Sequence, residues 1–419
     1  MIHWPAAVPS NLAIWAIAAA ATACVIVRPG KWPEAVWAVG GAFALLACGL
    51  LSPSSALHAV LEGTDVYLFL IGMMLLSELA RREGLFDTLA GWAVRHAGGS
   101  AKRLFALVYG IGVVVTVFMS NDATAVVLTP AVYAVAKRAG ARPMPYLFAC
   151  ALIANAASFV LPISNPANLV VFGEHMPPLL AWMRAFALPS IASIVVTWAV
   201  LALLFRGELA EAVDHDSHVP RLSGTGRLAA VGIGGVVLAM LAASALDFPL
   251  GAPTLMASAL AIAAVQASKR EAPWELLRHV SWSVLALVAG LFVLVAGVGR
   301  TGLLATLTDV LRTAAQAAPR ETAWGAGAIV AFASNLLNNL PAGLIAGTAV
   351  HTGAMPDAVR SAVAIGIDLG PNLSVTGSLA TILWLVALRR EGEHVSAWQF
   401  LKVGAVAMPV ALVAALACL

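Results

Sequence analysis

Apolar stretches long enough to cross a bilayer follow one another along almost the whole chain. A helix needs about 20 apolar residues to span the hydrocarbon core. Ten stretches come close to this length or exceed it: roughly 11–28, 34–51, 65–80, 145–171, 186–206, 228–246, 252–267, 281–299, 358–388 and 401–419. They do not alternate with a period of two, which favours helices over a β-barrel. Because 61% of the residues are hydrophobic and only 11% are charged, we expect an all-α polytopic membrane protein.

Two further segments, 103–137 and 321–351, each hold two apolar stretches around an asparagine-rich tip. Basic residues flank the first segment at both ends: Lys102, Arg103, Lys137, Arg138 and Arg142. Since Lys and Arg mark the cytoplasmic side, both ends lie on that side and the tip turns back inside the membrane. We therefore expect two re-entrant hairpins. The amphipathic stretches beside them, about 84–99 and 302–318, are too polar to span and are expected to lie along the interfaces.

The basic residues also predict the topology. With ten crossings and two hairpins, 19 of the 24 Lys and Arg residues fall on the cytoplasmic side, which places both termini outside. Each half then has five crossings and one hairpin, so the second half enters the membrane with the opposite orientation, as an inverted repeat. We expect a first repeat over 1–206, a cytoplasmic connecting loop over 207–227 that need not be ordered, and a second repeat over 228–419.

In each repeat, polar residues and prolines interrupt the apolar stretch that follows the hairpin. The first break begins at Pro162 and ends at Asn168, and the second begins at Asp368 and ends at Ser378. Unpartnered amides and hydroxyls are costly in hydrocarbon, and paired breaks in corresponding halves indicate a substrate site at the midplane. The candidates for lining it are polar residues of the tips and breaks: Asn121, Asn335, Asn338, Asn339, Ser164, Asn165, Asn168, Asn372, Thr376 and Ser378.

A simpler interpretation exists for several of these side chains. Ser120, Asn121, Ser334 and Asn335 are suited to cap the second helix of each hairpin, and capping and substrate contact are compatible. Asn338 and Asn339 are not needed for capping, which favours a role in the site. Asn155, upstream of the first break, is also expected to face the cavity.

Two carboxylates, Asp122 and Asp368, fall inside these motifs at membrane depth. Ionisable groups within a membrane are functional by default, and desolvation disfavours their charged form. We expect at least one of them to carry a proton or cation, although Asp122 would also serve as a helix cap and Asp368 as a bond to a neighbouring helix. For Glu78, beside Arg81 and Arg82, a surface ion pair is expected instead.

Other motifs indicate little further chemistry. Asn165-Pro166-Ala167 matches the NPA signature of water channels, but those channels carry two copies, so a helix break is the preferred interpretation. The cysteines and histidines show no metal-ligand spacing, and no metal is expected beyond a transported one. No nucleotide-binding or hydrolase motif is present, so we expect no cofactor, no nucleic-acid partner and no enzyme, and any active transport must use an ion gradient.

Three blocks of the chain resemble the arsenite efflux permeases of the ArsB type. They are Ser120-Asn121-Asp122 to Leu128-Thr129-Pro130; Ser334-Asn335 with Asn338-Asn339-Leu340-Pro341; and Asp368-Leu369-Gly370-Pro371-Asn372 with Gly377-Ser378-Leu379-Ala380-Thr381 and Leu383-Trp384. The last block is specific to these permeases, whereas the hairpin motifs recur across the wider ion transporter superfamily. The resemblance covers roughly residues 60–419 and implies a scaffold domain with a mobile transport domain that carries the hairpins and broken helices.

The resemblance implies the export of As(III) or Sb(III) in exchange for protons across a prokaryotic plasma membrane, in some systems with a cytoplasmic arsenite-stimulated ATPase as partner. The residues are compatible with this, because As(OH)3 is neutral and its three hydroxyls suit amides and hydroxyls. The absence of Lys and Arg from the motifs disfavours anionic substrates, although helix N-termini also bind anions. A Na⁺/H⁺ antiporter and a passive channel for small neutral solutes stay open as alternatives.

Overall fold

The computed structural model describes residues 7–173, 176–214, 222–272, 274–278 and 280–419. Within these ranges all the regular structure is helical, and the only strand-like pairing is an isolated bridge between Ser100 and Ala212. This confirms the all-α prediction. In the part of the chain that the structure describes, six helices are by length and composition able to cross a membrane singly: α1, α6, α11, α12, α13 and α21.

The helices of the first half follow the predicted order of spans, hairpin and break. They are α1 (Ala7–Val27), α2 (Glu34–Ala47), α3 (Pro53–Glu62), α4 (Thr64–Arg82), α5 (Leu85–Ala97), α6 (Ala101–Phe118), α7 (Asn121–Ala123), a π-helical turn η2 (Thr124–Leu128), α8 (Thr129–Arg138), α9 (Met144–Ala156), a 3-10 turn η3 (Pro162–Ser164), α10 (Pro166–Phe172) and α11 (Leu179–Leu204). Helices α3 and α4 meet at a bend of 48°.

The helices of the second half repeat this order. They are α12 (Gly224–Ala245), α13 (Gly251–Lys269), α14 (Trp274–Arg278), α15 (Ser283–Gly299), α16 (Leu303–Ala317), α17 (Pro319–Leu337), α18 (Asn339–Thr352), α19 (Asp357–Leu369), a 3-10 turn η6 (Gly370–Asn372), α20 (Leu379–Arg390) and α21 (Ala397–Leu416). The expected spans 145–171 and 358–388 are thus each built from two short helices, since α9 and α19 end at the breaks.

Equivalent helices of the two halves pack against equivalent partners in the opposite or the same half. Helix α4 packs closely against α13, and its counterpart α15 packs closely against α2. In the same way α1 contacts α2 as α12 contacts α13, and α6 contacts α9 as α17 contacts α19. Such reciprocal pairs are expected when a pseudo-two-fold axis relates the halves.

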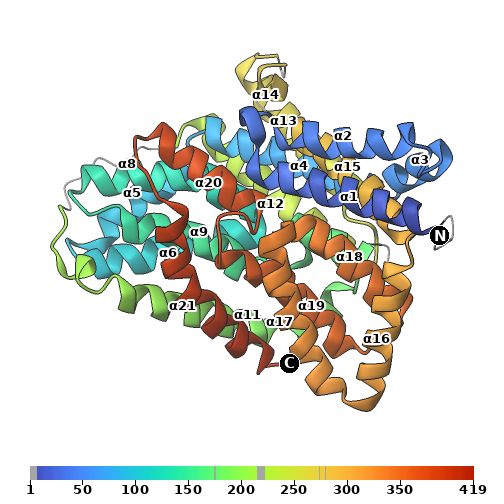
Figure 1. The fold of residues 1–419 in the computed structure, drawn as a ribbon. Helices are drawn as coiled ribbons and strands as arrows, with labels where there is room; N and C mark the ends of the chain where they lie inside the picture. The colour runs from blue at the N-terminus through green and yellow to red at the C-terminus, as the bar shows by residue number, and fades with distance from the viewer. Residues whose placement is uncertain (1–6, 174–175, 215–221, 273, 279) are drawn as a thin grey trace.

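The helices form two groups. In Figure 1, α1 to α4 lie together with α13 and α15 along one side, and the hairpins and broken helices occupy the rest of the molecule. The two groups meet where α10 contacts α4 and α18 contacts α15. The second hairpin and the last part of the first broken helix therefore approach the first group of helices at these two contacts.

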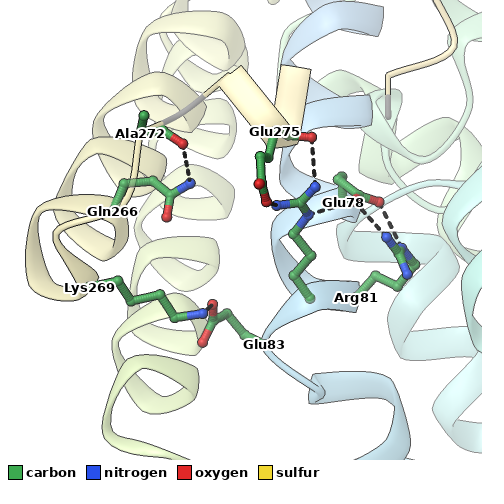
Figure 2. A network of polar contacts seen from close by, with 8 residues as sticks. Glu78, Arg81, Glu83, Gln266, Lys269, Ala272 and Glu275 are labelled. Carbon is green, nitrogen blue, oxygen red and sulfur yellow. Dashed lines mark hydrogen bonds and ion pairs between the residues drawn. The ribbon is translucent and has the colours of Figure 1, made fainter. Parts of the chain in front are cut away.

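The C-terminal end of α4 carries an ion-pair network (Figure 2). Glu78 accepts hydrogen bonds from Arg81 at 2.6 and 2.7 Å and from Arg82 at 2.9 Å. Arg82 also donates to the carbonyl oxygen of Glu275 in α14 at 2.6 Å. The expected Glu78 ion pair is confirmed, but Glu78 is buried rather than on the surface, since it is only 8% exposed.

The described part of the connecting loop is bound to the base of the first hairpin. The N–H of Val213 donates to the Gly99 carbonyl at 3.1 Å, and the N–H of Asp214 donates to the Ala139 carbonyl at 2.8 Å. Arg142 and Glu211 form an ion pair at 2.8 Å. This part of the loop therefore belongs structurally to the hairpin, while residues 215–221 lie outside the described ranges.

Candidate functional site

The first hairpin turns at Ser120. Its backbone is extended, and its Oγ accepts the N–H of Ala123 at 3.1 Å, which caps the returning helix. The neighbouring Asn121 uses Oδ1 to accept the N–H of Asp122 at 2.9 Å. The helix then widens into the π-helical turn η2, where Pro130 follows without an N–H to donate. Such turns are frequent at functional sites.

The second hairpin turns at Asn338, whose φ of 72° is uncommon for a residue with a side chain but is tolerated by asparagine. Asn338 also caps α18, since its Oδ1 accepts the N–H of Leu340 at 3.4 Å. The expectation that Ser334 and Asn335 cap this helix and that Asn338 does not is therefore wrong.

The Nδ2 of Asn338 donates to the Thr376 carbonyl at 3.2 Å, and the N–H of Asn339 donates to the Gly377 carbonyl at 2.8 Å. The tip is therefore fixed onto the break between α19 and α20. The side chain of Asn339 itself takes no part in these bonds.

The first break ends where Asn165 caps α10. Its Oδ1 accepts the N–H of Ala167 at 3.0 Å, and Pro166 occupies the first helical turn. Ser164 donates to the Val117 carbonyl of the first hairpin at 3.0 Å, and Asn168 donates to the Ser158 carbonyl at 2.9 Å. The NPA triplet is thus a helix break, as expected from its single copy.

The second break ends where Ser378 caps α20 by accepting the N–H of Thr381 at 3.1 Å. Asn335 holds the break from the side of the second hairpin. Its Nδ2 donates to the Gly370 carbonyl at 2.9 Å, and its Oδ1 accepts from the Ser374 hydroxyl at 2.7 Å. The hydroxyl of Thr376 donates to the Asn335 carbonyl at 2.9 Å.

The two breaks are also bonded to each other. Asn165 Nδ2 donates to Asp368 Oδ1 at 2.6 Å, and Asn155 Nδ2 donates to Asn372 Oδ1 at 3.0 Å. Asn155 and Asp368 occupy equivalent places, each the second-last residue of its helix and ten positions before the cap of the next helix. The two halves thus contribute matching side chains, of which only Asp368 can ionise.

A pocket lies where both tips and both caps meet the other group of helices. Its polar lining comes from Asn121, Asp122, Asn165, Asn339 and Ser378. Its apolar lining comes from Leu70 of α4 and Val284 of α15 together with Pro166, Leu340, Leu379 and Ala380. No Lys, Arg or His is among these lining residues, so the described wall offers amides, hydroxyl and one carboxylate but no cation.

The structure divides the predicted site residues into two sets. The five polar lining residues were all predicted from the sequence, and Asp368 lies directly behind one of them, Asn165. The remaining candidates do not line the pocket and bond with backbone or other polar groups of the tips and breaks: Asn335, Asn338, Ser164, Asn168, Asn372 and Thr376. Asn155, expected to face the cavity, binds Asn372 instead.

The apolar wall was not predicted. Leu70 and Val284 come from helices without polar interruptions, and nothing in their sequence distinguishes them from other apolar residues of the same helices. Only the packing of the hairpin tips against α4 and α15 selects them.

Comparisons with known proteins identify the chain as a membrane transporter. Residues 15–366 match the CitMHS family model, described as citrate transporters. An arsenical pump membrane protein of Escherichia coli is 27% identical over 356 residues, which cover 82% of this chain and 83% of that protein. An uncharacterized transporter of Mycobacterium tuberculosis (strain H37Rv) is 25% identical over 430 residues and 96% of each chain.

A solved structure shares the fold. The YdaH transporter of Alcanivorax borkumensis matches with a TM-score of 0.57 at 16% identity, over 87% of this chain and 86% of that one. The similarity to the arsenical pump membrane proteins confirms the resemblance drawn from the motifs.

Proposed function

The chain belongs to the CitMHS family of citrate transporters, and from this membership and the pocket we propose a secondary active transporter that exports trivalent arsenic and antimony in exchange for protons. Membership in a transporter family makes the chain a multi-pass membrane transporter rather than an enzyme, as expected. The proposed setting is a prokaryotic plasma membrane with both termini outside. The arsenical substrate is suggested by the names of the E. coli relatives.

The observation that carries the proposal is the polar but uncharged character of most of the pocket. In neutral water As(OH)3 is uncharged, and each of its hydroxyls is both donor and acceptor, which matches the Asn121, Asn165, Asn339 and Ser378 side chains. Burying these hydroxyls without partners would be unfavourable. The lining therefore suits a small neutral polyhydroxy solute.

The same lining disfavours citrate. A tricarboxylate needs cations to offset its desolvation. Among the described residues of the lining, only Asp122 is ionisable, and it repels anions when charged. Helix N-termini also bind anions, but at α10 and α20 Asn165 and Ser378 already accept backbone N–H groups. We therefore propose a neutral substrate despite the name of the family.

Proton coupling is proposed to use Asp122 and Asp368. Asp122 lies in the pocket, and Asp368 lies behind Asn165 and is fully buried. A proton taken up from outside neutralises a carboxylate, and its release inside restores the charge. In this proposal the hairpins and breaks form the transport domain, which moves against α4 and α15 to expose the pocket to each side in turn.

Two alternatives make different predictions. A Na⁺/H⁺ antiporter is the closer one, because Asp122 and the Asn121 amide are hard oxygen ligands in the same pocket. A passive channel would equilibrate arsenite without accumulating it. The pocket is lined by both hairpin tips, as expected for a carrier, which disfavours the channel but not the antiporter.

The test uses inverted membrane vesicles with and without an imposed pH gradient. We expect arsenite accumulation that requires the gradient and no ATP, that antimonite inhibits, and that arsenate, phosphate and sulfate leave unchanged. Equilibration without accumulation would favour the channel. Sodium transport without any response to arsenite would favour the antiporter, and strong inhibition by arsenate would indicate an anion carrier. A requirement for added cytoplasmic extract and ATP would indicate an ATPase partner.

A further inference from the structure

We infer that Asn165 transmits the protonation of Asp368 to the substrate pocket, so that Asp368 controls substrate affinity without touching the substrate. The inference rests on the proposed function and adds a positioning residue to it. Among the described residues, Asn165 both lines the pocket and donates a hydrogen bond to Asp368. This side-chain contact therefore joins the two halves of the chain directly at the pocket.

The position of Asp368 requires such an intermediary. Its side chain is fully buried, and it does not line the pocket. Its Oδ1 accepts from Asn165 Nδ2 at 2.6 Å, whereas its Oδ2 has no hydrogen-bond partner among the described residues. A proton can therefore bind at Oδ2. The loss of negative charge then reaches the pocket through the hydrogen bond between Oδ1 and Asn165.

The amide of Asn165 is well placed to respond. Its Oδ1 accepts the N–H of Ala167, and its Nδ2 donates to Asp368 and more weakly to Ser158 Oγ at 3.4 Å. An ionised carboxylate forms a stronger, charge-assisted bond than a neutral acid. Ionised Asp368 therefore fixes the amide with its oxygen toward the Ala167 N–H, and protonation loosens it. Proton and substrate then oppose each other's binding, which an exchanger requires.

Among the described residues, no charged group is bonded to Asp368. The titratable or charged side chains on α19 and on the helices packed against it are Tyr146 and Cys150 on α9, Arg184 on α11, Arg320 and Glu321 on α17, His351 on α18, Lys402 on α21, and Asp357 and Arg360 on α19 itself. Most of them lie in the first or last turns of their helices, away from the break. His351 bonds to the Val171 carbonyl, and Lys402 lies over the Trp398 ring.

The first half of the chain supplies a natural control. Asn155 occupies the place equivalent to Asp368 and bonds to a break residue, Asn372, as Asp368 bonds to Asn165. The fold thus already accommodates an amide at this kind of position. We therefore expect Asp368→Asn to fold and to retain a neutral bond to Asn165.

The experiment measures the dissociation constant of arsenite for purified protein across pH, in wild type, Asp368→Asn, Asn165→Ser and the double variant. Serine keeps the cap at position 165 but removes the amide. Acidification should weaken wild-type binding by about tenfold, the ratio expected between a charge-assisted and a neutral hydrogen bond. Both single variants should lose the same part of this pH dependence, and the double variant should lose no more. Any part of the pH dependence that comes from Asp122 is the same in all four proteins, because all four retain this residue.

The matched control is Asn121→Ser, which removes a pocket amide that is not bonded to Asp368. It should weaken binding at every pH and keep the wild-type pH dependence. If Asn165→Ser also keeps the full pH dependence, or if the losses in the two single variants add, the inference is wrong.

A measurement without arsenite separates this inference from the proposed function. The difference in thermal unfolding temperature between wild type and Asn165→Ser should be larger in alkaline than in acidic buffer, and should not vary with pH when Asp368 is Asn. A pH-independent difference would exclude the link even if arsenite transport is found. If the unfolding temperatures show this pH dependence but the protein does not bind arsenite, the link between Asp368 and Asn165 stands and the proposed substrate is wrong.

Discussion

Neighbouring residues of the same type have different tasks at this site. Asn338 and Asn339 are consecutive, yet Asn338 bonds to the Thr376 carbonyl while Asn339 lines the pocket. Likewise Asn335 holds the second break, and Asn121 lines the pocket from the first tip. A buried amide has four hydrogen-bonding positions, so its neighbours decide whether any is left for a substrate.

Asn339→Leu should therefore weaken arsenite binding without loss of the fold. The leucine leaves substrate hydroxyls unpaired, at about 1–3 kcal/mol, or about tenfold to a hundredfold in affinity. Equilibrium binding and thermal unfolding of the purified variant provide the two readouts. Asn338→Leu is the contrast, because it removes the bond to Thr376 and places leucine at a φ of 72°. An unfolding temperature lowered equally in both variants would contradict the different tasks of these residues.

The two carboxylates give a second prediction at this scale. Asp122→Asn and Asp368→Asn keep shape and polarity but remove titration. At least one should abolish arsenite accumulation driven by a pH gradient in inverted vesicles. Asp87→Asn, an exposed carboxylate on α5, is the control and should transport as wild type does. Full proton-coupled transport by both Asp122→Asn and Asp368→Asn would show that the proton carriers lie elsewhere.

At the scale of elements, glycines allow the second hairpin to lie against the broken helix. A Cβ at Gly366 would overlap the Gly327 carbonyl of α17, and a Cβ at Gly370 would overlap the Ala331 carbonyl. Both obstacles are backbone atoms, which cannot move aside as a side chain would. Close helix approach through small residues is the usual basis of packing within membranes.

Gly366→Ala should therefore lower stability by about 1–3 kcal/mol, the usual cost of overpacking. Gly325→Ala on α17 is matched to it, since a Cβ there meets nothing within 4 Å. That control should leave stability unchanged or raise it slightly, because alanine is the better helix former. Thermal unfolding in detergent measures both. Equal unfolding temperatures for the two variants would contradict the close approach of α17 and α19.

At the scale of the whole molecule, the pocket lies where two groups of helices meet. Leu70 and Val284 belong to α4 and α15, which are counterparts in the two halves, and the polar lining comes from the hairpins and breaks of both halves. A site shared in this way changes whenever one group moves relative to the other. This arrangement supports the proposed alternating access.

The inverted topology predicts the sidedness of the loops. In a variant with its native cysteines replaced, Lys102→Cys should react with an impermeant thiol reagent only from the cytoplasm. Gln316→Cys, at the end of α16, should react only from outside. Both side chains are exposed, and both lie outside the pocket. The measurement compares intact cells with inverted vesicles, and labelling of both positions from the same side would contradict five crossings in each half.

The sequence by itself determined the helical class, the two hairpins and the two breaks. A bilayer leaves few alternatives, because every backbone polar group must be bonded within a helix or face a wet cavity. For the same reason polar residues at membrane depth are conspicuous, and all five polar residues of the pocket were predicted. The short helix α3 was not predicted, because it begins at Pro53 after the Ser52 cap, in a segment that mixes polar and apolar residues.

Only the tertiary structure decided which polar residues face the pocket and which hold the fold. Asn165 meets Asp368, Asn155 meets Asn372, and Asn335 reaches Gly370. Two of these contacts join the two halves of the chain, and no local pattern encodes them. The choice of partner depends on how distant helices approach one another, and a side chain that finds a carbonyl there is no longer available to a substrate.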